Sequence, residues 1–260
     1  MSVDMRTVKK FWHVLLVAVA FVIAYYFFGI ERANNLTFIE RDSPEGFREL
    51  VLDKRSSSFN PLLGIKLNAR SSELGDQQRS SDLNVCEALY RDPTSPVVGD
   101  HESEVTIVEF FDYRCPYCKI LEKILSQAQF KYRLRVVYKE WPILGKSSEL
   151  AARAALAADK QGRYQEFHTK LMRSRFIPTV GYIDNLVAGL GMDRLRLSRD
   201  MASNETTLAL RRTSALAKEL GFFSTPYLVV GRTIVQGAVT RAELESLIEI
   251  EVSSELPCLY

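Results

Sequence analysis

The sequence has few cysteines and no large excess of charge of either sign. Four cysteines in 260 residues are too few for a disulfide scaffold, so their placement matters more than their number. The net charge of +2 gives no reason to expect nucleic acid as a partner. Heptads and internal repeats are absent, so nothing indicates a coiled coil or a repeat array. The composition, 47% hydrophobic and 25% charged, is that of a folded globule.

Charged residues are also missing from one long stretch of the sequence near the N-terminus. Residues 11–30 are almost wholly apolar, and about 20 such residues span a bilayer core. Three basic residues against one acid precede the run, which predicts a cytoplasmic segment over 1–10. A cleavable signal peptide is the alternative, but no small-x-small cleavage site follows. We therefore expect a single-pass transmembrane anchor in a bacterial inner membrane, with the rest of the chain in the periplasm.

Residues 31–88 have mixed character and few long apolar stretches. Clustered serines and many charges predict a tether that is partly disordered or forms short helices. The sequence Ser-Pro-Glu at 43–45 favours a short helix over 47–52, and a second short helix is expected over 82–91.

The chain is organised around Cys115-Pro116-Tyr117-Cys118. The pair follows an apolar run over 105–111, which predicts a buried strand, and precedes apolar residues at helical spacing. Pro116 suits the first helical position, which places Cys115 at the N-cap. There a thiolate faces free backbone N–H groups and the positive end of the helix dipole. We therefore expect Cys115 to have a lowered pKa and to act as the nucleophile, with Cys118 as its disulfide partner.

Other roles for this pair are a zinc site or an inert structural disulfide. Structural zinc usually needs two such pairs, whereas Cys86 and Cys258 stand alone and far apart. An inert disulfide would not need the strand, proline and helix around it. Redox chemistry is the interpretation that these residues favour, with no metal site and no cofactor.

Further elements follow from hydrophobic periodicity and glycine positions. Strands are predicted near 97–98, over 133–139, and as a hairpin over 227–230 and 233–236. Helices are predicted over 149–159, 164–173, 182–190, 205–220 and 241–252.

This order of elements resembles a thioredoxin-like α/β fold with a helical insertion. The chain resembles the DsbA family of extracytoplasmic thiol-disulfide oxidoreductases, and its Com/Scs-type members in particular. Four stretches carry the resemblance: VEFFDYRCPYC at 108–118, YKEWPILG at 138–145, QEFH at 165–168 and LGFFSTP at 220–226. It implies a DsbA-like domain over 89–260, with the insertion at about 146–221.

The resemblance also implies roles for three residues. Pro226 matches the family's cis-proline, and Thr225 before it would pair through its backbone with a bound substrate chain. Glu109 matches the buried acid beneath the cysteines, whose pKa burial would raise and which would exchange a proton with Cys118. A solvent-facing Glu109 is the alternative. His168 is interpreted as a histidine of a helix core.

The expected activity is transfer of the Cys115–Cys118 disulfide to unfolded or reduced secreted proteins. The resemblance implies reoxidation by a quinone-linked membrane oxidase. Two alternatives are an isomerase or reductase kept reduced by a transmembrane electron donor, and a protein that binds Cu(I) on the two thiolates. Cys86 and Cys258 flank the domain in an oxidising compartment, and we expect them to form a structural disulfide.

Overall fold

The computed structural model describes residues 36–52, 85–99, 102–103 and 105–252. The predicted anchor and most of the predicted tether lie outside these ranges. Among the described residues, no helix is long and apolar enough to cross a membrane. The chain divides into two compact units, Met1–Thr37 and Phe38–Tyr260, and the site described below belongs to the second.

A seven-stranded sheet forms the centre of this unit, in the order β1-β2-β7-β6-β4-β5-β3. Its central strand β4 pairs in parallel with β5 and antiparallel with β6, and both neighbours are almost fully buried. The strands are β1 (Thr37–Glu40), β2 (Arg48–Val51), β3 (Val97–Gly99), β4 (Val105–Phe111), β5 (Leu134–Glu140), β6 (Tyr227–Val230) and β7 (Thr233–Gln236). The strands predicted at the centre of the fold are thus confirmed, with β5 shifted by one residue.

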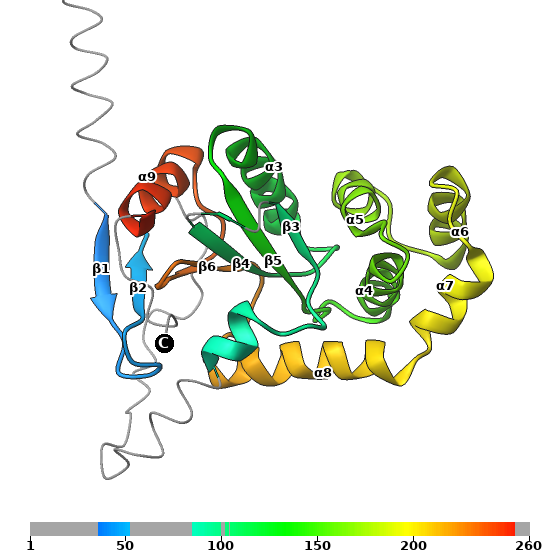
Figure 1. Ribbon diagram of the computed structural model, residues 1–260, viewed down its shortest axis with the longest axis horizontal. Helices are drawn as coiled ribbons and strands as arrows, with labels where there is room; N and C mark the ends of the chain where they lie inside the picture. Colours follow the sequence, from blue (N-terminus) through cyan, green and yellow to red (C-terminus); the bar gives the residue numbers. More distant parts are fainter. Residues whose placement is uncertain (1–35, 53–84, 100–101, 104, 253–260) are drawn as a thin grey trace, which may run out of the picture. The chain divides into compact units, whose positions relative to one another are not determined.

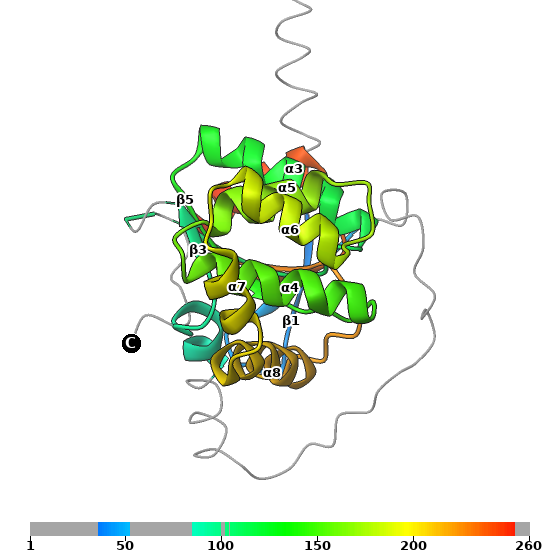
Figure 2. The same ribbon diagram turned by 90° about the vertical axis from the view of Figure 1, so that its right-hand side faces the viewer.

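Helices cover both faces of this sheet. The helices α3 and α9 lie on one face, and α8 lies on the other with a short helix over 85–90 (Figures 1 and 2). The labelled helices are α3 (Pro116–Lys131), α4 (Lys146–Asp159), α5 (Tyr164–Arg173), α6 (Val180–Gly189), α7 (Arg194–Met201), α8 (Asn204–Glu219) and α9 (Arg241–Val252). This is the α/β arrangement with a helical insertion that the sequence predicts, although α7 was not predicted as a separate helix.

The alternation of side chains along β4 decides which residues face the cysteines. Val108 and Phe110 belong to the core cluster that contains Leu89 and Leu216, on the face covered by 85–90 and α8. Glu109, between them, points to the opposite face, which α3 covers. An acidic side chain is therefore buried beneath the helix that carries the cysteine pair.

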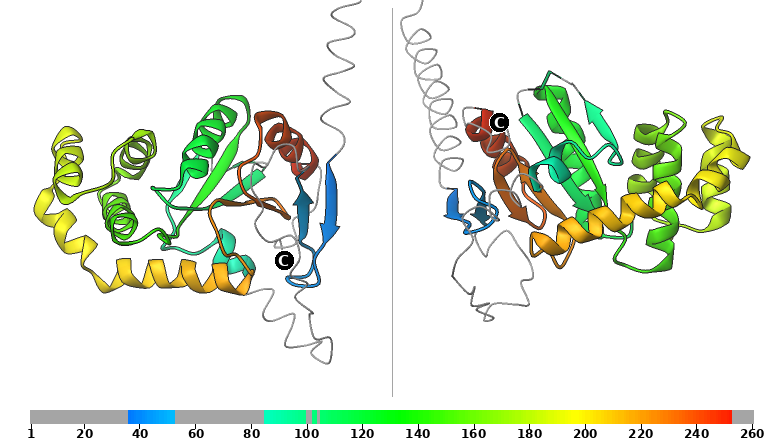
Figure 3. Two further views of the ribbon diagram at one scale, coloured as in Figure 1. Left: turned by 180° about the vertical axis from the view of Figure 1, so that it is seen from behind. Right: turned by 60° about the horizontal axis from the view of Figure 1, so that its bottom comes forward.

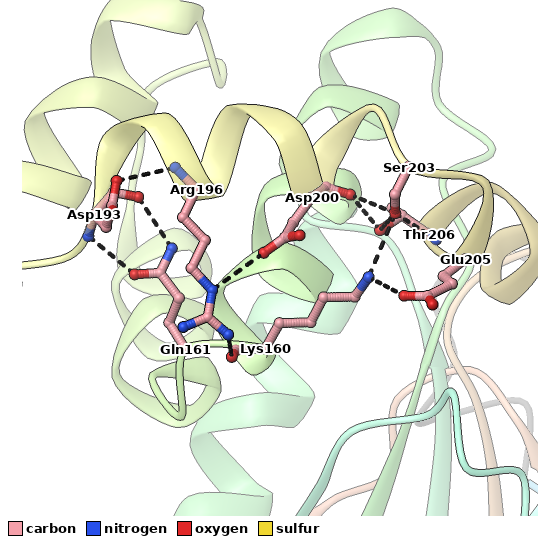
Figure 4. A network of polar contacts seen from close by, with 8 residues as sticks. All are labelled: Lys160, Gln161, Asp193, Arg196, Asp200, Ser203, Glu205 and Thr206. Atoms are coloured by element: carbon pink, nitrogen blue, oxygen red, sulfur yellow. Dashed lines mark hydrogen bonds and ion pairs between the residues drawn. The ribbon is translucent and has the colours of Figure 1, made fainter.

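The insertion runs from α4 to α8, and α8 returns from it to the sheet (Figure 3). Polar contacts fix the end of α4 to α7 and to the start of α8 (Figure 4). Gln161 and Asp193 exchange two hydrogen bonds of 2.9 and 3.0 Å, and Arg196 donates to the Lys160 carbonyl at 2.6 Å. These three hydrogen bonds are exposed to solvent, so they orient the helices more than they stabilise them.

Within the predicted tether, the structure describes two strands, β1 and β2, and residues 85–88, which belong to the helix over 85–90, inside the short helix predicted over 82–91. The prediction of a short helix over 47–52 is wrong: Arg48–Val51 is β2, which pairs in parallel with β7. Arg48 donates to Thr233 Oγ1 at 2.8 Å and pairs with Glu251 of α9 at 2.7 Å. Four-residue strands have too little alternation to be recognised, and their partners lie far away in sequence.

Candidate active site

Cys115 and Cys118 lie where β4 passes into α3, as predicted. Cys115 is the N-cap of α3 and Pro116 occupies its first turn. The Sγ atom of Cys115 accepts a hydrogen bond from the Cys118 backbone N–H at 3.3 Å. Both cysteines are free thiols and are buried, with 4% of Cys115 and none of Cys118 exposed.

The electrostatics separate the roles of the two cysteines. Hydrogen bonding from the Cys118 side chain, aided by Thr225 and by the N–H groups of Cys118 and Tyr117, lowers the pKa of Cys115 to about 6 against the effect of burial. Burial, followed by the hydrogen bond to Cys115 and the charges of Cys115 and Glu109, raises the pKa of Cys118 well above its ordinary value. Cys115 is therefore the thiolate near neutral pH, and Cys118 retains its proton.

Thr225 and Pro226 lie against the nucleophile. The Thr225–Pro226 peptide bond is cis, as the resemblance implied. The thiol of Cys115 donates to the Thr225 carbonyl at 3.3 Å. The backbone of Thr225 is therefore beside the reactive sulfur, while its role in substrate binding stays a prediction.

Glu109 is fully buried, which rules out the solvent-facing alternative. Neither of its carboxylate oxygens has a hydrogen-bond partner among the described residues. Burial, and then the charges of Glu122, Cys115 and Glu140, raise its pKa well above the ordinary value. A buried, unpartnered carboxyl that is electrostatically coupled to both cysteines is suited to proton exchange with Cys118.

Three polar residues around the site were not predicted. Buried Asp112 accepts from the Leu144 N–H at 2.9 Å and from Ser148 Oγ at 2.7 Å, which fixes the chain after β5 beside the cysteine loop. Burial lowers the pKa of Lys119, and the charge of Cys115 partly opposes this. Glu122 lies one turn beyond Cys118 on α3. The helical spacing from Cys118 to Glu122 was the signal that could have identified Glu122.

Exposed apolar side chains surround the cysteine pair, and we call them the apolar rim. Tyr117 is 45% exposed, within the pair itself. Arg114 donates to the Leu144 carbonyl and Lys119 to the Ser174 carbonyl, which brings two loops with exposed apolar residues toward α3. The members of the rim are Tyr117, Ile143, Leu144, Phe176, Ile177 and Phe223.

The other two cysteines are separate from this site. Cys86 lies in the helix over 85–90 and is disulfide-bonded. Cys258 lies outside the described residues, so its pairing with Cys86 stays a prediction. In the part of the chain that the structure describes, no three histidine, cysteine or acidic residues are grouped so that they could hold a metal ion.

Comparison with known proteins identifies the family. The DSBA-like thioredoxin domain matches residues 106–249, more than half of the chain. The chain belongs to this family. The DsbA-like relatives and structural neighbours are thiol-disulfide oxidoreductases, which confirms the thioredoxin-like fold and the class of enzyme.

Two solved structures and one relative illustrate the likeness. A thioredoxin-like oxidoreductase from Silicibacter pomeroyi is 39% identical, with a TM-score of 0.63, over 65% of this chain and 98% of that one. The catalytic domain of Proteus mirabilis ScsC is 27% identical, with a TM-score of 0.62, over 68% and 99%. Disulfide bond formation protein D of Bacillus subtilis is 25% identical over 173 residues, 62% of this chain and 78% of that protein.

One match concerns only a segment of a much longer protein. The Na(+)/H(+) antiporter NhaA 1 of Salinispora arenicola is 33% identical over 107 residues, which is 38% of this chain and 16% of the antiporter.

Proposed function

We propose that this chain is a dithiol oxidase that transfers the Cys115–Cys118 disulfide to pairs of thiols in secreted proteins. The observation that carries the proposal is the N-cap position of Cys115, with its lowered pKa and the Thr225 carbonyl beside it. A thiolate of low pKa is a good leaving group, so a disulfide that contains Cys115 is readily attacked and reduced.

The reaction takes place in two exchanges. A substrate thiolate attacks Sγ of Cys115, the Cys115–Cys118 bond breaks, and Cys118 leaves as a thiolate that takes a proton from Glu109. A second substrate thiolate then attacks the substrate sulfur of the mixed disulfide and releases Cys115 as a thiolate. The substrate loses two electrons and gains a disulfide, and the enzyme becomes a dithiol.

The apolar rim supports an unfolded protein as the substrate. Its exposed side chains come from several loops, so it offers apolar contact to a bound chain. The Thr225 carbonyl offers a hydrogen-bond acceptor to the backbone of an extended chain. Both kinds of contact are largely independent of the sequence that is bound.

A refolding assay with the full chain in mild detergent tests this function. The oxidised protein should restore activity to reduced ribonuclease, and the Cys115→Ser variant should not. Failure to oxidise reduced ribonuclease, combined with rescue of scrambled ribonuclease, would reverse the assignment.

An isomerase or reductase is the second candidate, and Thr225 favours it. Its side chain helps to hold Cys115 as a thiolate, and the resemblance implies a threonine before the cis-proline in family isomerases and Scs-type members. The enzyme would then be kept reduced by a transmembrane electron donor, whereas the oxidase needs a quinone-linked membrane oxidase.

Our proposal for the location of the protein in a bacterial cell is based on the apolar run over residues 11–30. We propose a single-pass anchor in the inner membrane with the catalytic domain in the periplasm. Reporters fused after Asn60 should be active only if they work outside the cytosol. Release of a shortened, soluble chain would show instead that the segment is cleaved.

A further inference from the structure

A second buried polar cluster lies between α3, β5 and α5, and the reaction described above does not use it. His168 of α5 is 1% exposed, and its Nε2 atom lies 3.2 Å from Glu122 Oε2 of α3, without hydrogen-bond geometry. Its Nδ1 atom lies 3.0 Å from the Tyr113 hydroxyl and 3.4 Å from the Tyr164 hydroxyl.

The hydrogen bonds of the two tyrosines decide which nitrogen of His168 carries a proton. Tyr113 and Tyr164 both donate to Glu140 Oε1, at 2.8 and 3.0 Å. Their hydroxyl oxygens therefore present lone pairs to His168 Nδ1, which must be the N–H donor.

The neighbouring contact then requires one more proton. With Nδ1 protonated, a neutral His168 would present the Nε2 lone pair to an ionised Glu122 in a buried contact. A proton on either group removes this repulsion. The imidazolium–carboxylate form and the imidazole–carboxylic acid form both make the His168–Glu122 pair neutral.

The charge of this pair matters for Glu109. Among the charged groups that raise the pKa of Glu109, Glu122 has the largest effect. Glu109 also lacks any hydrogen bond that could stabilise its carboxylate within the described part of the chain. An uncompensated negative charge on Glu122 would therefore keep Glu109 protonated to higher pH, so that it could not accept another proton.

Other titratable groups interact with these three residues or with Glu140 beside them. They are Cys115 and Cys118 on α3, Tyr138 and Glu140 on β5, Asp112 and Tyr113 in the loop after β4, Tyr164 on α5 and Asp159 on α4. Apart from His168, none of these groups is a cation. Lys119 of α3 interacts with the charge of Cys115 and donates to the Ser174 carbonyl, so the charge of Glu122 is compensated by His168.

We propose that His168 is a positioning residue for thiol-disulfide exchange, which shares one proton with Glu122 and thereby leaves Glu109 able to accept the proton of Cys118. The proposal builds on the proposed function. The affected step is the attack of Cys118 on a mixed disulfide at Cys115. Cys118 gives its proton to Glu109, its sulfur bonds to Cys115, and the bound thiol leaves with the electron pair of the broken bond.

The rate of this step can be measured with the full chain and an aromatic disulfide that releases a coloured thiolate. Cys115 of the reduced protein releases the first thiolate, and the attack by Cys118 releases the second. The rate of the second release should rise with pH as Glu109 becomes ionised. Substitution of His168 by glutamine leaves Glu122 uncompensated, so the rise should move to higher pH. If the rise of the rate moves up by one pH unit, the step is about tenfold slower at any pH below the rise.

Two further variants separate charge from packing. Glu122→Gln removes the charge that His168 compensates, so Glu122→Gln combined with His168→Gln should not show the movement to higher pH. Lys170→Gln removes a charge from the exposed face of the same helix and should leave the profile unchanged. An unmoved profile for His168→Gln, or a movement that persists in the double variant, overturns the proposal.

A second readout keeps the test decisive if His168→Gln does not fold. His168→Asn in a Cys115→Ser background should raise the pH at which the ultraviolet absorbance of the Cys118 thiolate appears, and Glu122→Gln should reverse this. An unchanged titration overturns the proposal. These measurements need no protein substrate, so their failure is distinguishable from a wild-type chain that cannot oxidise ribonuclease.

Discussion

At the scale of single residues, two groups define the site. The pKa of one is lower than that of the free side chain, and the pKa of the other is higher. The pKa of Cys115 is lowered from 9.0 to about 6, and the pKa of Glu109 is raised well above 4.5. Each shift links the chemistry to folding stability, because a group that titrates differently in the folded and unfolded states makes stability depend on pH.

Cys115 should stabilise the reduced folded chain through its thiolate. Because its folded pKa is lowered from 9.0 to about 6, this contribution is complete above about pH 9, declines as the pH falls and is lost below about pH 6. Urea unfolding of the reduced wild type and of reduced Cys115→Ser, compared across this range, measures it. A difference in the free energy of unfolding that does not change with pH would contradict the assignment.

Glu109 should have the opposite effect on stability. Its folded pKa is raised, so the protonated carboxyl is favoured, and this stability is lost as the pH rises above about 4.5. Glu109→Gln should therefore gain stability over the oxidised wild type by up to about 1.4 kcal/mol per pH unit above that value, while Cys118 reacts more slowly. Equal stability of the two proteins from pH 4 to pH 8 would show that Glu109 ionises freely.

At the scale of elements, a buried ion pair joins β2 to α9, in addition to the pairing of β2 with β7. Arg48 of β2 pairs with the fully buried carboxylate of Glu251 on α9, which also accepts from the Arg232 N–H and the Thr233 hydroxyl. An arginine removed from such a site leaves a buried carboxylate without its countercharge.

Arg48→Ala should therefore lower the free energy of unfolding by roughly 3–5 kcal/mol. Arg91→Ala provides the control, because Arg91 and Glu87 form an exposed pair one helical turn apart and should lose less than about 1 kcal/mol. Chemical denaturation of the oxidised proteins measures both. Equal losses would show that the Arg48–Glu251 ion pair contributes no more to stability than an exposed pair.

The sequence was informative where the structure is local. The strand over 105–111, the helix that begins at Pro116 and the hairpin over 227–236 follow from periodicity, a proline and a turn, and the structure has them at these bounds. The sequence was uninformative where the two partners of a contact lie far apart along the chain. The partner of β2 lies about 185 residues further along the chain, and His168 meets Glu122 only after α5 packs against α3. The burial of His168 was predicted, but its contacts were not.

At the scale of the whole molecule, the remaining two cysteines concern stability rather than chemistry. Cys86 is disulfide-bonded, and we predict Cys258 as its partner. A disulfide that closes so long a loop stabilises by roughly a few kcal/mol in the chain-entropy view. Cys258→Ser should lower stability by that amount without reductant and by nothing in its presence. Free peptides that contain Cys86 and Cys258 in a non-reduced digest would refute the pairing.

The central claim is that Cys115 exchanges disulfides with a substrate and that Cys118 is its partner in the disulfide that is transferred. The most direct measurement mixes the oxidised chain with a reduced peptide that contains two cysteines, and follows both by mass spectrometry after alkylation. We predict that the peptide loses two hydrogens and that Cys115 and Cys118 become alkylated. The reduced Cys118→Ala variant, mixed instead with the disulfide form of the peptide, should form a mixed disulfide through Cys115, because the Cys115 thiolate breaks the peptide disulfide and no Cys118 is present to release the peptide. A peptide that stays reduced, or one that is captured on another cysteine, would contradict the account.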